Sequence, residues 1–269
     1  MKSIIIATAI AAFSVFWGAA QEKLAVKGSD TINAKLMPRL ADAYKAAGNE
    51  VTFEIEDKGS SSAFTNLEAG TADIGASSRA VKDSEKEKFS AKGQELVEHI
   101  AAIDMIAVIV NEKNKVDDLS LKQIEAIFTG EITNWAEVGG RPGSINVYTR
   151  NETSGTYATF QDLAMAKRDY GTNSQKMEGN RQIATEVAGD RNGIGYVGKA
   201  YASEEGAKTL LIEGVSFETS DADAYLIART LYYYTVGAPK GTAGKFLAWA
   251  KESPEATKII IDTGFTPSP

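Results

Sequence analysis

Two long apolar runs constrain the fold of this chain more than any other feature, and they lie far apart in the sequence. The first, residues 100–110, reads IAAIDMIAVIV, and the second covers residues 228–237. Each is too short for a membrane-spanning helix, which needs about 20 apolar residues, and each therefore predicts strand structure. Around them the chain alternates strand-like and helix-like segments, ending in a predicted strand at Lys258–Ile261. This alternation is typical of α/β folds.

The two runs also predict how the chain is divided. A chain that leaves one lobe along the first run and returns along the second has a discontinuous first lobe, residues 21–104 plus 234–269, and a second lobe, residues 105–233. Each lobe then has the usual size of a domain. Two crossings form a hinge, and the cleft between two lobes is a common ligand site.

The first twenty residues, MKSIIIATAIAAFSVFWGAA, have the pattern of a secretory signal peptide. Lys2 gives a positive start, an apolar run follows, and small residues precede a predicted cleavage after Ala20. A membrane anchor is the alternative, but the run is shorter than a spanning helix requires. We therefore expect residues 1–20 to be a cleaved signal peptide and the remaining chain to be soluble in the periplasm.

Composition excludes several classes of function. The chain has no cysteine, which excludes disulfides, iron–sulfur clusters, thiol catalysis and a lipid-modified cysteine. Its one histidine, His99, excludes multi-histidine metal sites and argues against a Ser-His-Asp triad. With 29 basic and 36 acidic residues, the formal net charge is −7, which argues against a nucleic-acid partner. We expect no metal and no cofactor.

Four turns rich in Ser, Thr and Gly follow predicted strands, and three of them open predicted helices. A helix start presents unpaired N–H donors and partial positive charge, and hydroxyls add donors without adding charge. Capping of each helix explains any single turn equally well. In open α/β sheets, however, ligands bind beyond the carboxyl ends of strands, so four such ends predict one small-anion site. The turns are Lys27–Ile32, Gly59–Ala63, Gly75–Arg79 and Arg150–Thr156.

Arg150 and Glu152 in the fourth turn sharpen this prediction. The planar guanidinium matches an oxyanion in bidentate fashion. A carboxylate repels a bare anion but accepts the proton of hydrogen phosphate, so the pair predicts selection of phosphate over fully ionised sulfate. A local surface ion pair is the alternative interpretation.

At these turns the chain resembles the periplasmic phosphate-binding proteins of bacterial phosphate ABC uptake systems. The similarity covers about residues 22–267, and the order and spacing of its segments are more specific than any one of them. The segments are Gly28–Thr31, Gly59–Ser62, Ile74–Arg79, Ile127–Trp135, Arg150–Thr156, Gly193–Val197 and Leu231–Tyr234.

The resemblance implies a periplasmic-binding-protein type II fold, in which two α/β lobes close on a dehydrated phosphate. Some members carry an aspartate that accepts the phosphate proton at the position of Ser78, so this role falls on Glu152 or on a backbone carbonyl. Arg79 is then either a partner of the acid or an exposed charge. The expected ligand-binding residues are Ser29, Thr31, Ile32, Ser60, Ser61, Ser77, Ser78, Arg150, Glu152, Ser154, Gly155 and Thr156.

The expected function is capture of inorganic phosphate, without catalysis, by a monomer that hands it to the membrane permease subunits of an ABC transporter. One alternative keeps the fold but changes the ligand to sulfate or molybdate. Another is a secreted phosphohydrolase with a serine nucleophile and Arg150 as phosphate clamp. The lack of metal-ligand clusters and of a base beside any serine weakens that alternative.

Overall fold

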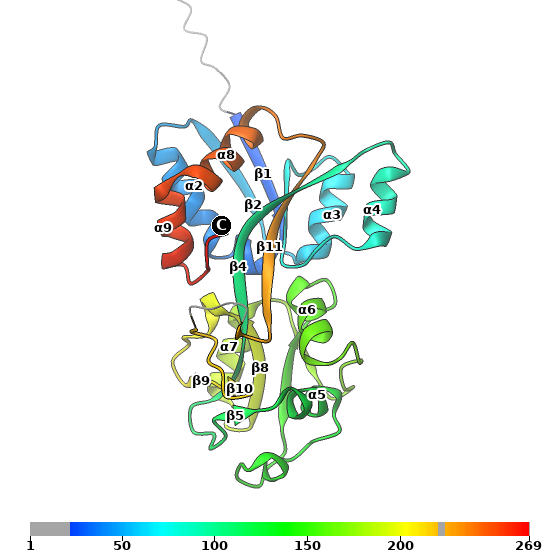
Figure 1. Cartoon of the computed structure of the whole chain (residues 1–269), viewed down its shortest axis with the longest axis vertical. Helices are drawn as coiled ribbons and strands as arrows, with labels where there is room; N and C mark the ends of the chain where they lie inside the picture. Colours follow the sequence, from blue (N-terminus) through cyan, green and yellow to red (C-terminus); the bar gives the residue numbers. More distant parts are fainter. Residues whose placement is uncertain (1–21, 220–223, 269) are drawn as a thin grey trace, which may run out of the picture.

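The computed structural model describes residues 22–219 and 224–268, so the predicted signal peptide lies outside the described residues. These residues form two halves, drawn at the top and bottom of Figure 1, through which β4 (Leu96–Asn111) and β11 (Ala228–Val236) both pass. The two apolar runs are therefore strands, and each crosses between the halves. No helix within the described ranges has the length and apolar character needed to cross a bilayer.

The first half comprises most of the chain before β4 and all of the described chain after β11 (Figure 1). Its elements are β1 (Glu22–Gly28), α1 (Asp30–Asn33), α2 (Leu36–Ala46), β2 (Val51–Glu56), α3 (Ser60–Glu68), β3 (Ile74–Ser77), α4 (Asp83–Ser90), α8 (Gly241–Glu252) and α9 (Pro254–Asp262).

The second half is built from the chain between the two crossing strands (Figure 1). Its elements are β5 (Asp118–Leu119), α5 (Leu121–Thr129), the 3-10 helix η1 (Trp135–Val138), β6 (Asn146–Arg150), α6 (Gly155–Ala164), β7 (Gln175–Met177), α7 (Asn180–Gly189), β8 (Gly193–Gly198), the 3-10 helix η2 (Lys199–Tyr201), β9 (Ala207–Thr209) and β10 (Leu211–Ile212).

One sheet runs through both halves in the order β2-β1-β3-β11-β4-β8-β6-β7, with β9 also paired to β4. Its two ends are parallel: β1 pairs with β2 and β3, and β6 pairs with β7 and β8. The crossing strands β4 and β11 join these ends through antiparallel pairing. Because β1, β3 and β6 all end at the boundary between the halves, the turns that follow them are directed toward one another.

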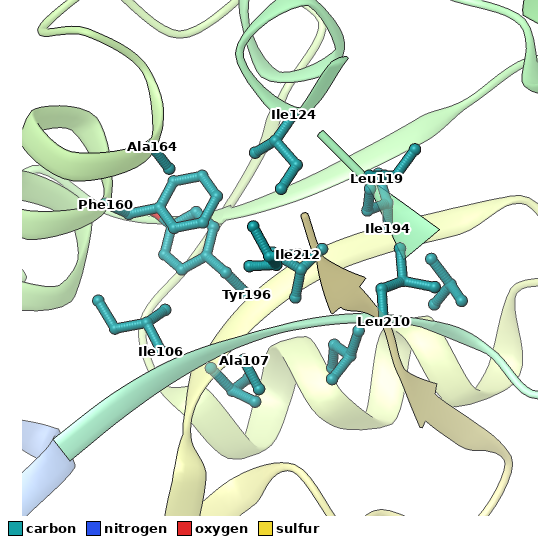
Figure 2. Packing of buried hydrophobic residues seen from close by; sticks show 14 of the residues in the cluster. Ile106, Ala107, Leu119, Ile124, Phe160, Ala164, Ile194, Tyr196, Leu210 and Ile212 are labelled. Carbon is teal, nitrogen blue, oxygen red and sulfur yellow. The ribbon is translucent and has the colours of Figure 1, made fainter. Parts of the chain in front are cut away.

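Each half has its own hydrophobic core. The first core contains buried residues from 24–102 and 231–265, and the second contains buried residues from 105–227. In the second core, the rings of Phe160 and Tyr196 stack with centroids 4.0 Å apart (Figure 2). The hydroxyl of Tyr196 accepts a hydrogen bond from the backbone N–H of Arg150 at 3.1 Å. This core therefore holds the end of β6, where the fourth turn begins.

The structure corrects the prediction of a final strand. Residues 258–261 belong to α9, although three consecutive isoleucines favour a strand by propensity. A helix forms here because Ser253 caps its first turn and Pro254 is its first residue. Ala256 and Ile260 then lie one turn apart on its buried face. A cap and a proline upstream thus outweigh the local preference of the side chains.

Candidate functional site

The first three turns meet at the edge of the first half. Gly28 ends β1 with φ +135°, and a Cβ there would lie 2.2 Å from the carbonyl oxygen of Ala76, so only glycine lets β1 and β3 come this close. As a result the hydroxyls of Ser29 and Ser78 contact each other, and the backbone N–H of Ser78 donates to Ser60 Oγ at 2.8 Å.

The fourth turn, from the second half, closes against the same place. Thr31 Oγ1 and Thr156 Oγ1 lie 3.1 Å apart, although 125 positions separate them in the sequence. The backbone N–H of Ser61 donates to the carbonyl of Thr153 at 3.0 Å. Gly155 faces Ser60 so closely that a Cβ would lie 2.3 Å from Ser60 Oγ. All four turns therefore share one buried location between the halves.

Ser154 is the N-cap of α6, and its hydroxyl accepts hydrogen bonds from the helix while its own hydrogen is directed elsewhere. Its Oγ accepts hydrogen bonds from the backbone N–H groups of Thr156, at 3.1 Å, and Tyr157, at 3.3 Å. A hydroxyl has two acceptor lone pairs and one donor hydrogen, so both acceptors are occupied and the hydrogen is left to donate elsewhere. The cap thus serves the helix and supplies a donor at its positive end.

Arg150 is the buried guanidinium of the site, with 1% of its surface exposed. Nη1 lies 3.0 Å from Asp30 Oδ1, and Nη2 donates to the carbonyl of Glu178 at 2.6 Å. Its Nε–H is buried without a hydrogen-bond partner in the described structure. Buried donors are rarely left unpaired, so this atom marks a position where a ligand acceptor belongs.

Two residues that sequence reasoning missed hold Arg150 in place. Asp30, in α1, faces Arg150 across the boundary between the halves. Asn180, at the start of α7, donates to Asp30 Oδ1 from its backbone N–H at 2.9 Å and from Nδ2 at 2.8 Å. In the sequence, Asp30 reads as an ordinary acid of a first helical turn, and nothing in the pattern around Asn180 pairs the two.

A second missed pair lies on the crossing strands. Arg229 on β11 donates to Asp104 on β4, from Nη2 at 2.7 Å and from Nε at 3.1 Å, and both side chains are buried. Burial raises the pKa of the Asp104 carboxyl, and the guanidinium opposes this shift. Arg229 Nη1 also donates to Thr156 Oγ1 at 3.0 Å. The available sequence signal was a charged residue inside or beside each apolar run.

Comparisons with known proteins agree with this arrangement. Residues 17–253 match the model of the PBP superfamily domain. The chain is 30% identical over 266 residues to the phosphate-binding protein PstS of Pseudomonas aeruginosa PAO1, covering 90% of this chain and 82% of that protein. It is 29% identical to PstS of Bacillus subtilis 168, with 92% and 81% covered.

Solved structures agree as well. A candidate phosphate ABC transporter substrate-binding protein from Clostridium perfringens, solved with bound phosphate, superposes with a TM-score of 0.84 at 30% identity, covering 92% of this chain and all of that one. An ABC-type phosphate transport receptor from Vibrio cholerae gives a TM-score of 0.73 at 25% identity, with 91% and 100% covered.

This chain belongs to the PstS family. The expected periplasmic-binding-protein type II fold is thereby confirmed. The family does not by itself place the expected site residues, whose positions come from the structure of this chain.

Glu152 does not lie where it was expected. Its side chain is 71% exposed and its carboxylate pairs with Lys176 at 2.6 Å, which lowers the pKa of Glu152. Because the residue directs its side chain to solvent, it cannot be the buried acid facing an anion beside Arg150. The alternative interpretation, a local surface ion pair between Arg150 and Glu152, is also wrong, because Arg150 is buried and pairs with Asp30, whereas Glu152 pairs at the surface with Lys176.

The remaining expected residues differ in what their polar groups do. Ser77 donates its hydroxyl to the carbonyl of Arg79 at 2.7 Å and so serves its own turn. Ser61 Oγ accepts from Arg79 Nη2 at 3.3 Å. The backbone N–H of Ile32 donates to Ser29 Oγ at 3.4 Å. These three therefore support the turns, whereas the hydroxyls of Ser29, Thr31, Ser78, Ser154 and Thr156 gather at the boundary.

Arg79 fits neither role expected for it. It is 7% exposed, so it is not an exposed charge. It pairs with Glu85 of α4 at 2.6 Å, whereas Glu152 pairs with Lys176, so it is not the partner of Glu152. It joins the third turn to α4 within the first half. Within residues 22–219 and 224–268, no group of three His, Cys, Asp or Glu side chains is placed to hold a metal ion.

Proposed function

We propose that the chain binds inorganic phosphate, as hydrogen phosphate, between its two halves and delivers it to a membrane ABC transporter. The observation that carries this proposal is a surplus of buried donors at the meeting point of the four turns. The Nε–H of Arg150 has no partner in the described structure, and Ser154 has both lone pairs occupied and a hydroxyl hydrogen to give. A small anion with several acceptor oxygens satisfies such a site.

The charge balance supports recognition through short hydrogen bonds. The two buried arginines, Arg150 and Arg229, are each paired with a buried aspartate, so the site is close to neutral. A chain of net charge −7 does not attract an anion from long range. Affinity comes instead from directional donors in a dry setting, where each hydrogen bond is stronger than in water.

The two halves act as lobes in this proposal. The expected division was residues 21–104 plus 234–269 for the first lobe and 105–233 for the second. Because Leu231 and Tyr233 pack in the first core, we place the return to the first lobe within β11 before Leu231, with β4 and β11 as the hinge. The bond from Ser61 to Thr153 and the approach of Gly155 to Ser60 and Ser78 correspond to the closed arrangement that encloses the ligand. The chain would act as a periplasmic monomer, exported by a cleaved signal peptide, and present this closed form to the transporter. The similarity to the phosphate ABC transporter substrate-binding protein of Clostridium perfringens supports that partner.

Asp30 takes the part first expected of Glu152. Its Oδ1 accepts from Arg150 and twice from Asn180, and no hydrogen bond to Oδ2 is found among residues 22–219 and 224–268. Thr31 and Asp30 share the Nδ2 group of Asn180, so this carboxylate borders the hydroxyl cluster. A buried carboxylate accepts the proton of hydrogen phosphate but is repelled by sulfate, which has no proton to give at neutral pH.

Calorimetric titration of ligand-free protein tests both parts of this proposal. We expect tight binding of phosphate and little heat with sulfate or molybdate, because only phosphate offers Asp30 a proton. Asp30→Asn should bring the affinities for phosphate and sulfate to within about tenfold of each other, since the repulsion of a buried charge is worth a kcal/mol or more. Glu152→Gln is the matched control and should bind like the wild type.

Three outcomes would contradict the proposal in different ways. Equal binding of phosphate and sulfate by the wild type would reject the selectivity. Loss of discrimination in Glu152→Gln but not in Asp30→Asn would show that Glu152, and not Asp30, accepts the phosphate proton. A wild-type chain that binds no oxyanion would reject the function itself.

The phosphohydrolase alternative makes a separate prediction. We expect no steady release of product from a chromogenic phosphate monoester, because the Ser154 hydroxyl oxygen is occupied by two backbone N–H groups and has no base beside it. His99, the only histidine of the chain, bonds to Thr235 Oγ1 at 3.2 Å within β4 and β11. Turnover that persists in a highly purified sample and disappears in Ser154→Ala would favour the enzyme.

A further inference from the structure

We infer that Arg229 is a positioning residue that fixes the hydroxyls of Thr31 and Thr156 as hydrogen-bond donors, and so makes the site prefer the more fully deprotonated form of phosphate. This inference rests on the proposed function and assigns a role to the hinge strand β11 within it. It depends on counting the lone pairs of two hydroxyls.

Thr31 has no acceptor capacity left. Its Oγ1 accepts a hydrogen bond from Asn180 Nδ2 at 3.2 Å and another from Arg229 Nη2 at 3.4 Å. A hydroxyl oxygen has two lone pairs, and these two bonds occupy both. Neither an amide NH₂ nor a guanidinium can accept a hydrogen at these atoms. Thr31 can therefore act toward any other group only as a donor.

Thr156 completes the count. Its Oγ1 accepts from Arg229 Nη1 at 3.0 Å and lies 3.1 Å from Thr31 Oγ1. If Thr31 donates to Thr156, both lone pairs of Thr156 are occupied, and its own hydrogen must find an acceptor outside the pair. If Thr31 does not donate to Thr156, the hydroxyl hydrogen of Thr31 must itself find an acceptor outside the pair. In either arrangement at least one hydroxyl hydrogen of the pair is left for an acceptor outside it, and in the proposed function that acceptor is a phosphate oxygen.

Arg229 is held so that it cannot release these oxygens. Asp104 accepts hydrogen bonds from Nε and Nη2 of Arg229, and Nη1 of Arg229 donates to the carbonyl of Ser78 at 3.3 Å. Asp104 is itself fixed by the backbone N–H of Lys199 at 3.1 Å. Because the guanidinium has only donors and keeps its charge across the physiological range, the direction of these hydrogen bonds does not change with pH.

The consequence concerns the second proton of phosphate. Dihydrogen phosphate carries two protons, of which Asp30 can accept one, and the second would then face hydroxyls that can only donate. Two opposed donors forfeit a hydrogen bond and leave polar groups unsatisfied in a buried site. Hydrogen phosphate has no such conflict, so its affinity exceeds that of dihydrogen phosphate.

The titratable and charged groups that face Arg229 are Asp104 on β4, Arg150 on β6 and Tyr196 on β8. Burial raises the pKa of Tyr196 well above its usual value. Burial also raises the pKa of Asp104, so a variant that removes Arg229 alone would add a titrating carboxyl. The informative variant therefore removes both charges: Asp104→Asn with Arg229→Met.

The experiment measures phosphate affinity between about pH 5.5 and about pH 8.5, spanning the second ionisation of phosphate. For the wild type we expect affinity for total phosphate to rise close to tenfold per pH unit on the acidic side, as a site that accepts only the dianion requires. The double variant should bind at least tenfold more weakly at the alkaline end and show a flatter rise. Arg229→Lys, which keeps donors without acceptors, should retain the steep rise.

Several outcomes decide the inference. A double variant with weakened affinity but an unchanged pH slope would overturn it and leave Arg229 a structural residue. If that variant does not fold, Thr156→Val replaces it and must lose more affinity at pH 8 than at pH 6, roughly tenfold more, since it removes one fixed donor. Arg168→Met, which alters an exposed ion pair with Glu125, is the matched control and should leave the whole profile unchanged. A wild type that binds no phosphate would reject the proposed function instead.

Discussion

Replacing Gly155 by alanine is expected to abolish tight phosphate binding while leaving both halves of the chain folded. A Cβ at this position would lie 2.3 Å from Ser60 Oγ and 3.0 Å from the Cβ atoms of Ser60 and Ser78. These neighbours belong to the first half, whereas Gly155 begins α6 in the second. Since Gly155 is not among the positive-φ glycines and alanine is favoured in helices, the clash arises only across the boundary.

The measurement compares phosphate titration with thermal unfolding. We expect affinity to fall by at least about a hundredfold, because a shift of even an ångström separates the donors of the two halves. The melting temperature of the ligand-free chain should change little. Gly189→Ala is the matched control, since Gly189 ends helix α7 and its Cβ would meet nothing within 4 Å. Wild-type affinity in Gly155→Ala would show that the halves need not approach this closely.

Replacing Arg150 by alanine is expected to have the other largest effect. The guanidinium is 1% exposed, pairs with Asp30 and keeps its Nε–H for the ligand. Its removal takes away a charge-assisted donor and leaves the Asp30 carboxylate buried without its cation. Breaking a buried pair in this way costs about 3–5 kcal/mol, which corresponds to a loss of roughly two to four orders of magnitude in affinity when the cost falls on the bound state.

A double-mutant cycle separates binding from folding here. Arg150→Ala, Asp30→Asn and the combination are compared by titration and by chemical unfolding, with exposed Arg141→Ala as the control for loss of an arginine. We expect the combination to recover part of the stability lost in Arg150→Ala but none of the affinity, because the donor to phosphate remains absent. An affinity loss in Arg141→Ala as large as that in Arg150→Ala would place the site elsewhere.

Much of this arrangement follows from local sequence patterns. The crossing strands could be predicted because Ile106–Val110 form a continuous apolar run, which a strand buried on both faces requires. The meeting of the four turns could be predicted because parallel strands end at the same edge of a sheet. Ser154 could be predicted as a cap, and its surplus hydrogen follows from that role.

The errors have a common physical origin. Asp30 and Asn180 lie 150 positions apart, and no local pattern records a contact made by the closing of two halves. Glu152 was assigned to the site because it is next but one to Arg150, yet alternate residues at the end of a strand need not share an environment. Arg229 was predicted only as part of a strand, because Asp104, the partner that neutralises its charge, belongs to a different apolar run.

The antiparallel pairing of β4 with β11 has a practical consequence for protein engineering. Met105 and Ala228 are direct partners in the ladder, so the chain enters and leaves the second half at neighbouring points. The intervening segment is therefore an insertion that is joined to the rest of the chain at two adjacent points. Grafting it between homologous hosts, or splicing a short hairpin in its place, would disturb one rung of the ladder while sparing the host's hydrophobic interior.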